Sequence, residues 1–195
     1  RWDSVDLGFK PTKRTWGAEV FPGSSLPNAM VQVSPVTKFH SGAGYQYEDS
    51  VIYGFTHTNK GHWNLCHIPL LPVTGTPTPG DYCSPFSHER ESAAPGYYQV
   101  FLDRYGVDAQ LSSTLRCAFH KYTYPAGAAA SLLADLQRSN EHVRAWDIRK
   151  EGDNVFAGWQ QTGEKMYFYA VANRPVTGIE PVVEGDREVR IVRFG

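Results

Sequence analysis

The sequence has few cysteines, and their spacing excludes several kinds of site. Cys66, Cys83 and Cys117 are the only ones in 195 residues, and they match no zinc-binding pattern. A free cysteine packs as a small hydrophobic side chain, so we interpret all three as buried free thiols. One disulfide with one thiol left over is the alternative. On either interpretation the cysteines do not define a compartment.

Long apolar runs and an excess of charge are absent as well. No run approaches the roughly 18 apolar residues that a membrane-spanning helix needs, and residues 1–4 show no signal-peptide core. The formal net charge of −1 leaves no basic stripe that could neutralise phosphates. We therefore expect neither membrane nor nucleic acid as a partner. Because the sequence begins without methionine, we expect it to be a piece of a longer chain.

Short apolar runs of strand length recur along the chain, and almost nothing repeats at helical spacing. Strands are predicted at residues 29–33, 51–55, 67–71, 97–102, 111–119, 142–149, 155–160, 166–172 and 189–194. The sequences at 103–106 and 151–154 predict hairpin turns, because Gly and Asn tolerate positive φ there. Residues 73–85 are expected to be an irregular loop. The pattern indicates an all-β sandwich, and without a repeat or a linker it indicates one domain over residues 1–195.

The most specific pattern lies between Phe21 and Pro72. Apolar strands alternate there with loops dense in Gly, Pro, His, Trp and Asn. The segments are Phe-Pro-Gly-Ser-Ser-Leu-Pro at 21–27, Gly-Tyr-Gln-Tyr at 44–47 and Phe-Thr-His-Thr-Asn-Lys-Gly-His-Trp-Asn at 55–64. The order and the amino-acid sequences of these segments resemble those of the N-terminal domain of the family 92 glycoside hydrolases, which are α-mannosidases. The resemblance extends from about residue 17 to about residue 169.

This resemblance implies a fold, a partner domain and a location. The fold would be a large antiparallel β-sandwich, the supersandwich also seen in galactose mutarotase. Residues 126–136 would form a core strand in it, although they are rich in helix formers. In the family an (α/α)6 helical domain follows, which we do not expect within these 195 residues, and the active site lies in the cleft between the two. A secreted, periplasmic or cell-surface location in a bacterium is implied by the resemblance alone.

The resemblance also implies a chemistry. The parent enzyme would be a calcium-dependent inverting exo-α-mannosidase that acts on α-mannosides or N-glycans. Its acid, base and calcium ligands would come mainly from the helical domain. We therefore expect no catalytic residue, no metal ligand and no activity in this chain alone.

Two carboxylates could still form a glycosidase pair within this chain. Glu89 and Glu91 are the densest acidic cluster in a loop, and in a strand they would share one face. Arg90 stands between them, and the segment leads into a turn at 93–96. We therefore favour a structural role for both.

What this chain would supply is one wall of the sugar pocket. The indole of Trp63 can stack on a sugar ring, while His62 and Asn64 beside it can hydrogen-bond hydroxyls. A structural tryptophan is an equally weighted alternative. His57 stands at a predicted strand end, where it either contacts ligand or orders the loop.

Two further residues complete the candidate set. Arg116 is predicted in mid-strand among apolar neighbours, so it must pair with Glu89 or Glu91 or face a cleft. Gly23 would let the backbone of loop 21–27 approach a ligand closely.

Three functions remain open. The chain is one wall of a mannose cleft, or an autonomous carbohydrate-binding module, or an assembly domain without sugar contact. A module would need an aromatic platform complete within the chain.

Overall fold

The structure, a computed structural model, describes residues 21–60 and 63–195, and these residues are built almost entirely of antiparallel strands. The sole helical element among them is the short 3₁₀ helix η1 (His88–Arg90). No helix in this part of the chain has the length and apolar character needed to cross a membrane. The predicted all-β class is confirmed.

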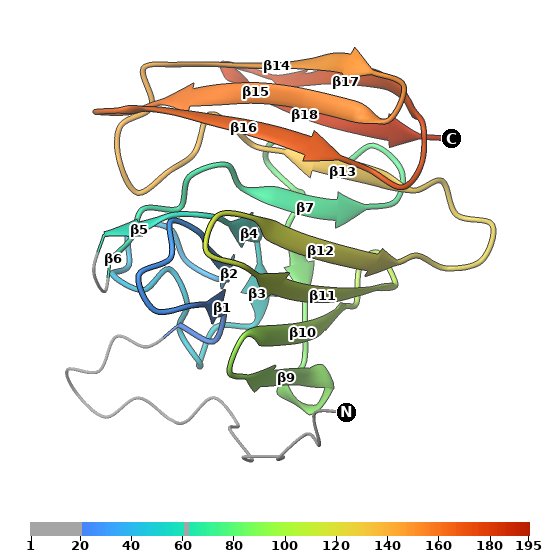
Figure 1. The fold of residues 1–195 in the computed structure, drawn as a ribbon. Helices are drawn as coiled ribbons and strands as arrows, with labels where there is room; N and C mark the ends of the chain where they lie inside the picture. The colour runs from blue at the N-terminus through green and yellow to red at the C-terminus, as the bar shows by residue number, and fades with distance from the viewer. Residues whose placement is uncertain (1–20, 61–62) are drawn as a thin grey trace.

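A seven-stranded sheet forms the middle of the molecule (Figure 1). Its order is β1 (Ser24–Ser25), β2 (Gln32–Val36), β4 (Gly54–Thr56), β7 (Leu70–Val73), β13 (Ser131–Ala134), β18 (Arg187–Phe194) and β17 (Val176–Glu184). One smaller sheet comprises β12 (Ala118–Thr123), β11 (Val107–Ser113), β10 (Tyr97–Leu102) and β9 (Glu91–Ala94). The other comprises β14 (Ala145–Gly152), β15 (Val155–Gln161) and β16 (Lys165–Val171).

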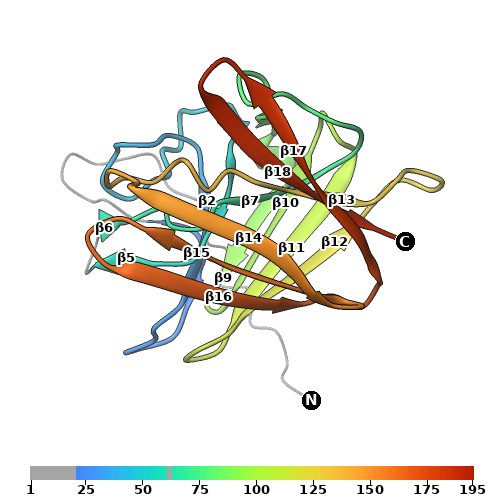
Figure 2. The same ribbon diagram turned by 90° about the horizontal axis from the view of Figure 1, so that it is seen from above.

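The inner strands of the central sheet are buried on both faces, so successive side chains along them enter two different cores. In β7, Leu71 packs into the core shared with β10 and β11, whereas Leu70 packs against Ile148 and Phe156 of the three-stranded sheet. In β13, Leu133 packs into the core shared with β10 and β11, and Leu132 packs on the side of the three-stranded sheet. Figures 1 and 2 show the two smaller sheets on opposite sides of β7, β13 and β18. The uninterrupted apolar runs of these strands are therefore explained by their position, since a smaller sheet packs on each of their two faces.

Two short pairs extend this arrangement at one end. β3 (Val51–Ile52) pairs with β8 (Ser84–Pro85), and β5 (Asn59–Lys60) pairs with β6 (Trp63–Asn64) in a separate hairpin. Figure 1 shows the β5–β6 hairpin beyond the end of the central sheet. Of the predicted site residues, Trp63 and Asn64 lie in this hairpin and His57 precedes it by two residues.

Several predicted boundaries are corrected by the structure. Residues 111–119 do not form one strand, because a turn closed by the bond from the Thr114 amide to the Cys117 carbonyl (2.9 Å) separates β11 from β12. Only Ser131–Ala134 of the predicted strand 126–136 is extended. The run at 29–33 becomes a strand only from Gln32, and the run at 67–71 only from Leu70.

The cysteines are free, as predicted, but their burial differs. Cys66 is buried, Cys83 is half-buried and Cys117 is exposed. The expectation that all three are buried is therefore wrong for Cys117, which lies in the β11–β12 turn.

Candidate functional site

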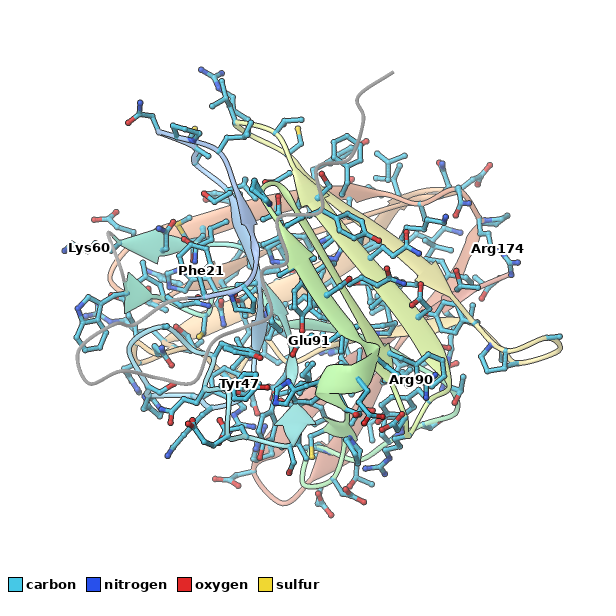
Figure 3. The ribbon with its side chains drawn as sticks, turned by 90° about the horizontal axis from the view of Figure 1, so that it is seen from below. Phe21, Tyr47, Lys60, Arg90, Glu91 and Arg174 are labelled. Atoms are coloured by element: carbon cyan, nitrogen blue, oxygen red, sulfur yellow. The ribbon has the colours of Figure 1, made fainter. Side chains whose placement is uncertain are left out.

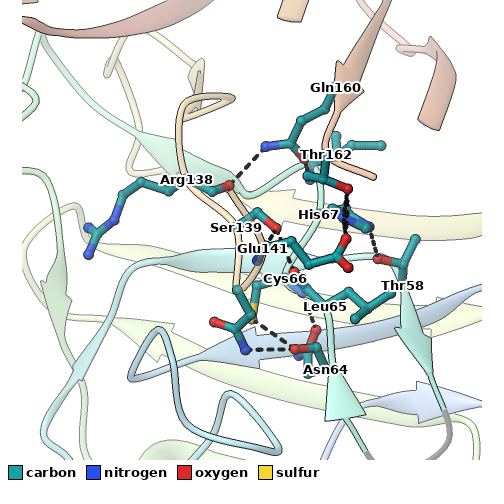
Figure 4. Close-up of polar contacts among 12 residues, drawn as sticks. Thr58, Asn64, Leu65, Cys66, His67, Arg138, Ser139, Glu141, Gln160 and Thr162 are labelled. Carbon is teal, nitrogen blue, oxygen red and sulfur yellow. Dashed lines mark hydrogen bonds and ion pairs between the residues drawn. The ribbon is translucent and has the colours of Figure 1, made fainter. Parts of the chain in front are cut away.

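Asn64 joins the β5–β6 hairpin to two other loops (Figure 4). The backbone N–H of Asn64 donates to the Gly42 carbonyl (2.8 Å), and its backbone carbonyl accepts from the Asn140 side chain (2.7 Å). The side-chain oxygen of Asn64 accepts from the Cys66 amide (2.8 Å). Asn64 is buried and its amide faces protein groups. It therefore holds three loops together at one end of the sheet.

The segment after Asn64 adopts an unusual backbone conformation. Cys66 and Ile68 both have φ of 54°, in the left-handed region that β-branched residues such as Ile68 rarely enter. The Ile68 amide donates to Gln160 Oε1 (2.8 Å), and the side chain of Gln160 in turn donates to the carbonyls of Leu136 and Arg138. Such conformations persist where the surroundings over-determine them, and they often occur at functional sites.

His67 lies between these two residues and is buried. Burial lowers the pKa of the His67 ring, so the ring is neutral near pH 7. Its Nε2–H donates to Glu141 Oε2 (3.0 Å), and its Nδ1 accepts from the Thr58 hydroxyl (2.7 Å). The strained backbone therefore points a single donor at Glu141.

Glu141 receives a second bond from the loop after β15. The Thr162 hydroxyl donates to Glu141 Oε2 at 2.6 Å. The hydrogen bonds from Thr162 and His67, with the charge of Lys60, lower the pKa of this carboxyl. The side chain of Glu141 is 43% exposed. An ionised carboxylate is thus fixed at the surface next to the β5–β6 hairpin.

Trp63 lies on this hairpin and its side chain is half exposed, at 51%. Lys60 is its cross-strand partner, so the two side chains project from one face of the hairpin. Figure 3 shows Lys60 at the outer edge of the molecule, away from Glu91. His62 lies outside the described residues.

His57 is partly buried behind the hairpin, in a defined chain of hydrogen bonds. Its Nδ1–H donates to the Ile68 carbonyl (2.9 Å), which leaves Nε2 to accept from His120 Nε2–H (2.9 Å). His120 Nδ1 then accepts from the Tyr122 hydroxyl (2.7 Å). Burial lowers the pKa of His57 to about 4 and that of His120 well below its ordinary value. The structure therefore places His57 where it orders the loop.

An open hollow of about 450 Å³ adjoins this end of the molecule. The Arg138 guanidinium lies over the Phe39 ring (4.1 Å to the centroid) and near the Tyr53 ring (4.9 Å), and it lines the hollow with them. Asn140 connects the hollow to the hairpin loops, because its side-chain oxygen accepts from the His40 amide (2.6 Å). The hollow and the hairpin are thus held by one loop, residues 138–141.

Arg116 and Gly23 occupy positions that the sequence did not predict. Arg116 is exposed in the β11–β12 turn, so its placement in mid-strand is wrong. Gly23 packs tightly against β2, where a Cβ would lie 2.6 Å from the Ser34 Cα and closer still to the Val33 carbonyl oxygen. Its close approach is therefore to the protein's own backbone.

Glu89 and Glu91 do not form a carboxylate pair. Glu89 is exposed on η1, whereas the carboxylate of Glu91 is fully buried. Glu91 accepts from the hydroxyls of Tyr98 (2.7 Å) and Tyr45 (3.0 Å) and from His88 Nδ1 (2.6 Å). Tyr47 stacks on the His88 ring, with 4.0 Å between centroids. Figure 3 shows Tyr47 and Glu91 in the same region.

Calcium does not fit the residues that the structure describes. Among residues 21–60 and 63–195 there is no cluster of three or more His, Cys, Asp or Glu side chains that could hold a metal ion.

The sequence did not single out Glu141, Lys60 or Thr162. These residues come from three separate segments, and only the fold brings the first and last of them onto His67. The one local signal is Asn140-Glu141 in a polar loop between two apolar runs, which is common in any protein.

Comparison with known proteins gives a consistent result. The model of the glycosyl hydrolase family 92 N-terminal domain matches residues 10–190. No curated protein sequence matches the chain. Among solved structures, the family GH92 α-mannosidase BT3965 from Bacteroides thetaiotaomicron is 25% identical with a TM-score of 0.80, over 90% of this chain and 29% of that one. Its complex with mannoimidazole has a TM-score of 0.78.

Two further structures support the same fold. The GH92 family glycosyl hydrolase ccman5 is 27% identical, with a TM-score of 0.73, over 90% of this chain and 28% of that one. The inverting mannosidase BT2199 from Bacteroides thetaiotaomicron has a TM-score of 0.74 over 91% of this chain and 27% of that one; at 21% identity it shows the fold alone. The chain spans under a third of each of these structures.

Proposed function

This chain belongs to the glycosyl hydrolase family 92 N-terminal domains, and on that basis we propose that it forms one wall of the mannoside-binding cleft of an α-mannosidase. The observation that carries the proposal is Trp63, whose indole is half exposed on a hairpin anchored by Asn64. An apolar indole face beside fixed polar groups is the usual composition of a sugar subsite.

The remainder of the enzyme is part of the same proposal. A C-terminal (α/α)6 domain would form the opposite wall and supply the acid, the base and the calcium ligands of an inverting mechanism. Support comes from the carboxylates of this chain, since Glu91 is fully engaged by two tyrosines and a histidine. Inversion needs an acid and a base about 6.5–9.5 Å apart with room for water between them. A buried carboxylate without such a partner does not meet that requirement.

One observation favours the second candidate, an autonomous carbohydrate-binding module. Tyr167 and Tyr169 project from the same face of β16 and are 72% and 70% exposed, so the chain has an aromatic surface apart from Trp63. Such a module would bind sugar tightly without the helical domain, whereas one wall of a cleft would bind weakly.

The deciding experiment is a titration of the 195-residue chain with methyl α-mannoside, followed through the indole N–H signals in NMR spectra. We expect one signal to shift, with an affinity on the order of millimolar because only one wall contacts the sugar. In Trp63→Ala that shift should disappear, while Trp159→Ala should retain it. Aryl α-mannosides should not be hydrolysed, with or without calcium.

Three outcomes would contradict these expectations. No shift at sugar concentrations up to about 100 mM would overturn the cleft wall. Micromolar binding that survives Trp63→Ala would favour the autonomous module. Turnover above a buffer control that is lost in Glu91→Gln would place the acid–base chemistry in this chain.

A further inference from the structure

We propose that Glu141 is a specificity-determining residue of this subsite, whose carboxylate accepts a hydrogen bond from a hydroxyl of the mannoside stacked on Trp63. The inference rests on the proposed function, because it assigns a polar partner to the same hairpin. It is carried by the geometry around Glu141.

The two oxygens of Glu141 have different surroundings. Oε2 accepts from His67 Nε2–H (3.0 Å) and from the Thr162 hydroxyl (2.6 Å). Among the described residues, no hydrogen bond to Oε1 is found. Because the side chain is 43% exposed, Oε1 is an oriented acceptor that a ligand can reach. A sugar hydroxyl is a suitable donor, and hydrogen bonds to a carboxylate are roughly twice as strong as neutral ones.

The orientation of this carboxylate is set from the interior. His67 is held from the other side by the Thr58 hydroxyl (2.7 Å), and the residues before and after it are both in the left-handed conformation. A neutral ring with Nδ1 occupied as an acceptor can present only its Nε2–H to Glu141. The backbone strain at Cys66 and Ile68 thus fixes one donor, which in turn fixes the acid.

The neighbouring groups suit a neutral polyol better than a cation or an anion. Lys60 acts on Glu141 electrostatically, and it is the cross-strand partner of Trp63. The surface therefore combines the indole face of Trp63, the fixed hydrogen-bond acceptor of Glu141 and the positively charged donor of Lys60. A metal ion would need more carboxylate ligands, and an anion would be repelled by Glu141.

The central variant is Glu141→Gln. The amide oxygen of glutamine can take the two bonds from His67 and Thr162, which places an NH₂ group where Oε1 lies. The variant therefore keeps the fold and the shape but removes the charged acceptor. Glu89→Gln is the matched control, because it makes the same charge change at an exposed residue of η1.

The measurement is an NMR titration of all three proteins with methyl α-mannoside and its 2-, 3-, 4- and 6-deoxy analogues. We expect Glu141→Gln to weaken methyl α-mannoside binding about five- to tenfold, and Glu89→Gln to bind as the wild type does. One deoxy analogue should bind the wild type equally weakly. The affinity of that analogue should be the same for Glu141→Gln as for the wild type, because removing the hydroxyl and replacing the carboxylate eliminate the same hydrogen bond.

The outcomes separate this inference from the proposed function. If the wild type binds through Trp63 and Glu141→Gln binds equally well, the assignment of Glu141 is overturned and the cleft wall stands. Additive losses for every deoxy analogue would likewise overturn it. If the wild type binds no mannoside at all, the proposed function fails and the assignment fails with it.

Discussion

At the scale of single residues, the partly buried pair His57 and His120 should make folding sensitive to acid. Both rings are neutral in the folded protein near pH 7, because burial lowers the pKa of His57 to about 4 and that of His120 well below its ordinary value. In the unfolded chain each ring takes up a proton near pH 6.5. The stabilisation is therefore complete above pH 6.5 and is lost as the pH falls from 6.5 towards 4.

The unfolding free energy should therefore fall measurably with falling pH. Between pH 7 and pH 5 the protonation of His57 in the unfolded chain should cost about 2 kcal/mol of unfolding free energy, and His120 should add a cost of the same sign. In His120→Gln, which lacks this second titrating ring, urea denaturation should show a smaller drop over the same pH range. Nitrogen chemical shifts should also show the hydrogen on Nδ1 of His57 and on Nε2 of His120. An equal drop in wild type and variant, or the same tautomer on both rings, would contradict this account.

At the scale of elements, the tight contact of Gly23 with β2 gives a prediction about stability. A Cβ at this position would lie 2.6 Å from the Ser34 Cα, so Gly23→Ala must displace the β1 segment. Overpacking of this kind costs typically about 1–3 kcal/mol. Gly163→Ala is the control, because its Cβ would meet nothing within 4 Å. Thermal unfolding of both variants is the measurement, and equal melting temperatures would show that β1 moves freely.

Elements with local turn chemistry were predictable from the sequence. Gly106, with φ of 64°, closes the β10–β11 hairpin, and β14 and β15 pair across the predicted turn at 151–154. The turn between β11 and β12 was missed because Thr114 to Cys117 contains no Gly, Asn or Pro. β17 was missed because it is an edge strand, mostly exposed, with Pro181 inside it.

The candidate site was predictable only in part, for a similar reason. A tryptophan among polar loop residues is a local feature, and it is the reason why the sequence singles out Trp63; the structure shows that its side chain is half exposed. The contact between His67 and Glu141 joins residues 74 positions apart. Neither a period nor a spacing in the sequence encodes such a contact, since it depends on the left-handed turn at Cys66 and Ile68. The turn residues there are not the ones that usually adopt this conformation.

At the scale of the whole molecule, three of the most exposed large apolar side chains among the described residues lie together on β16. Tyr167, Tyr169 and Val171 are 72%, 70% and 67% exposed on one face of this strand. Among the described residues β16 is also the edge of its sheet, so its outer backbone groups have no neighbouring strand. Apolar edges of this kind template pairing with another chain.

We therefore expect the isolated 195-residue chain to self-associate through β16 at concentrations on the order of tens of micromolar, a range in which exposed strand edges already aggregate. Light scattering after size exclusion should show dimers or larger species for the wild type. Tyr169→Lys should shift the equilibrium to monomer, because a charge on an edge strand opposes pairing. Trp63→Lys is the comparison that tests the other surface. If Trp63→Lys abolishes association and Tyr169→Lys does not, the hairpin face is the adhesive one and the role given to β16 is wrong.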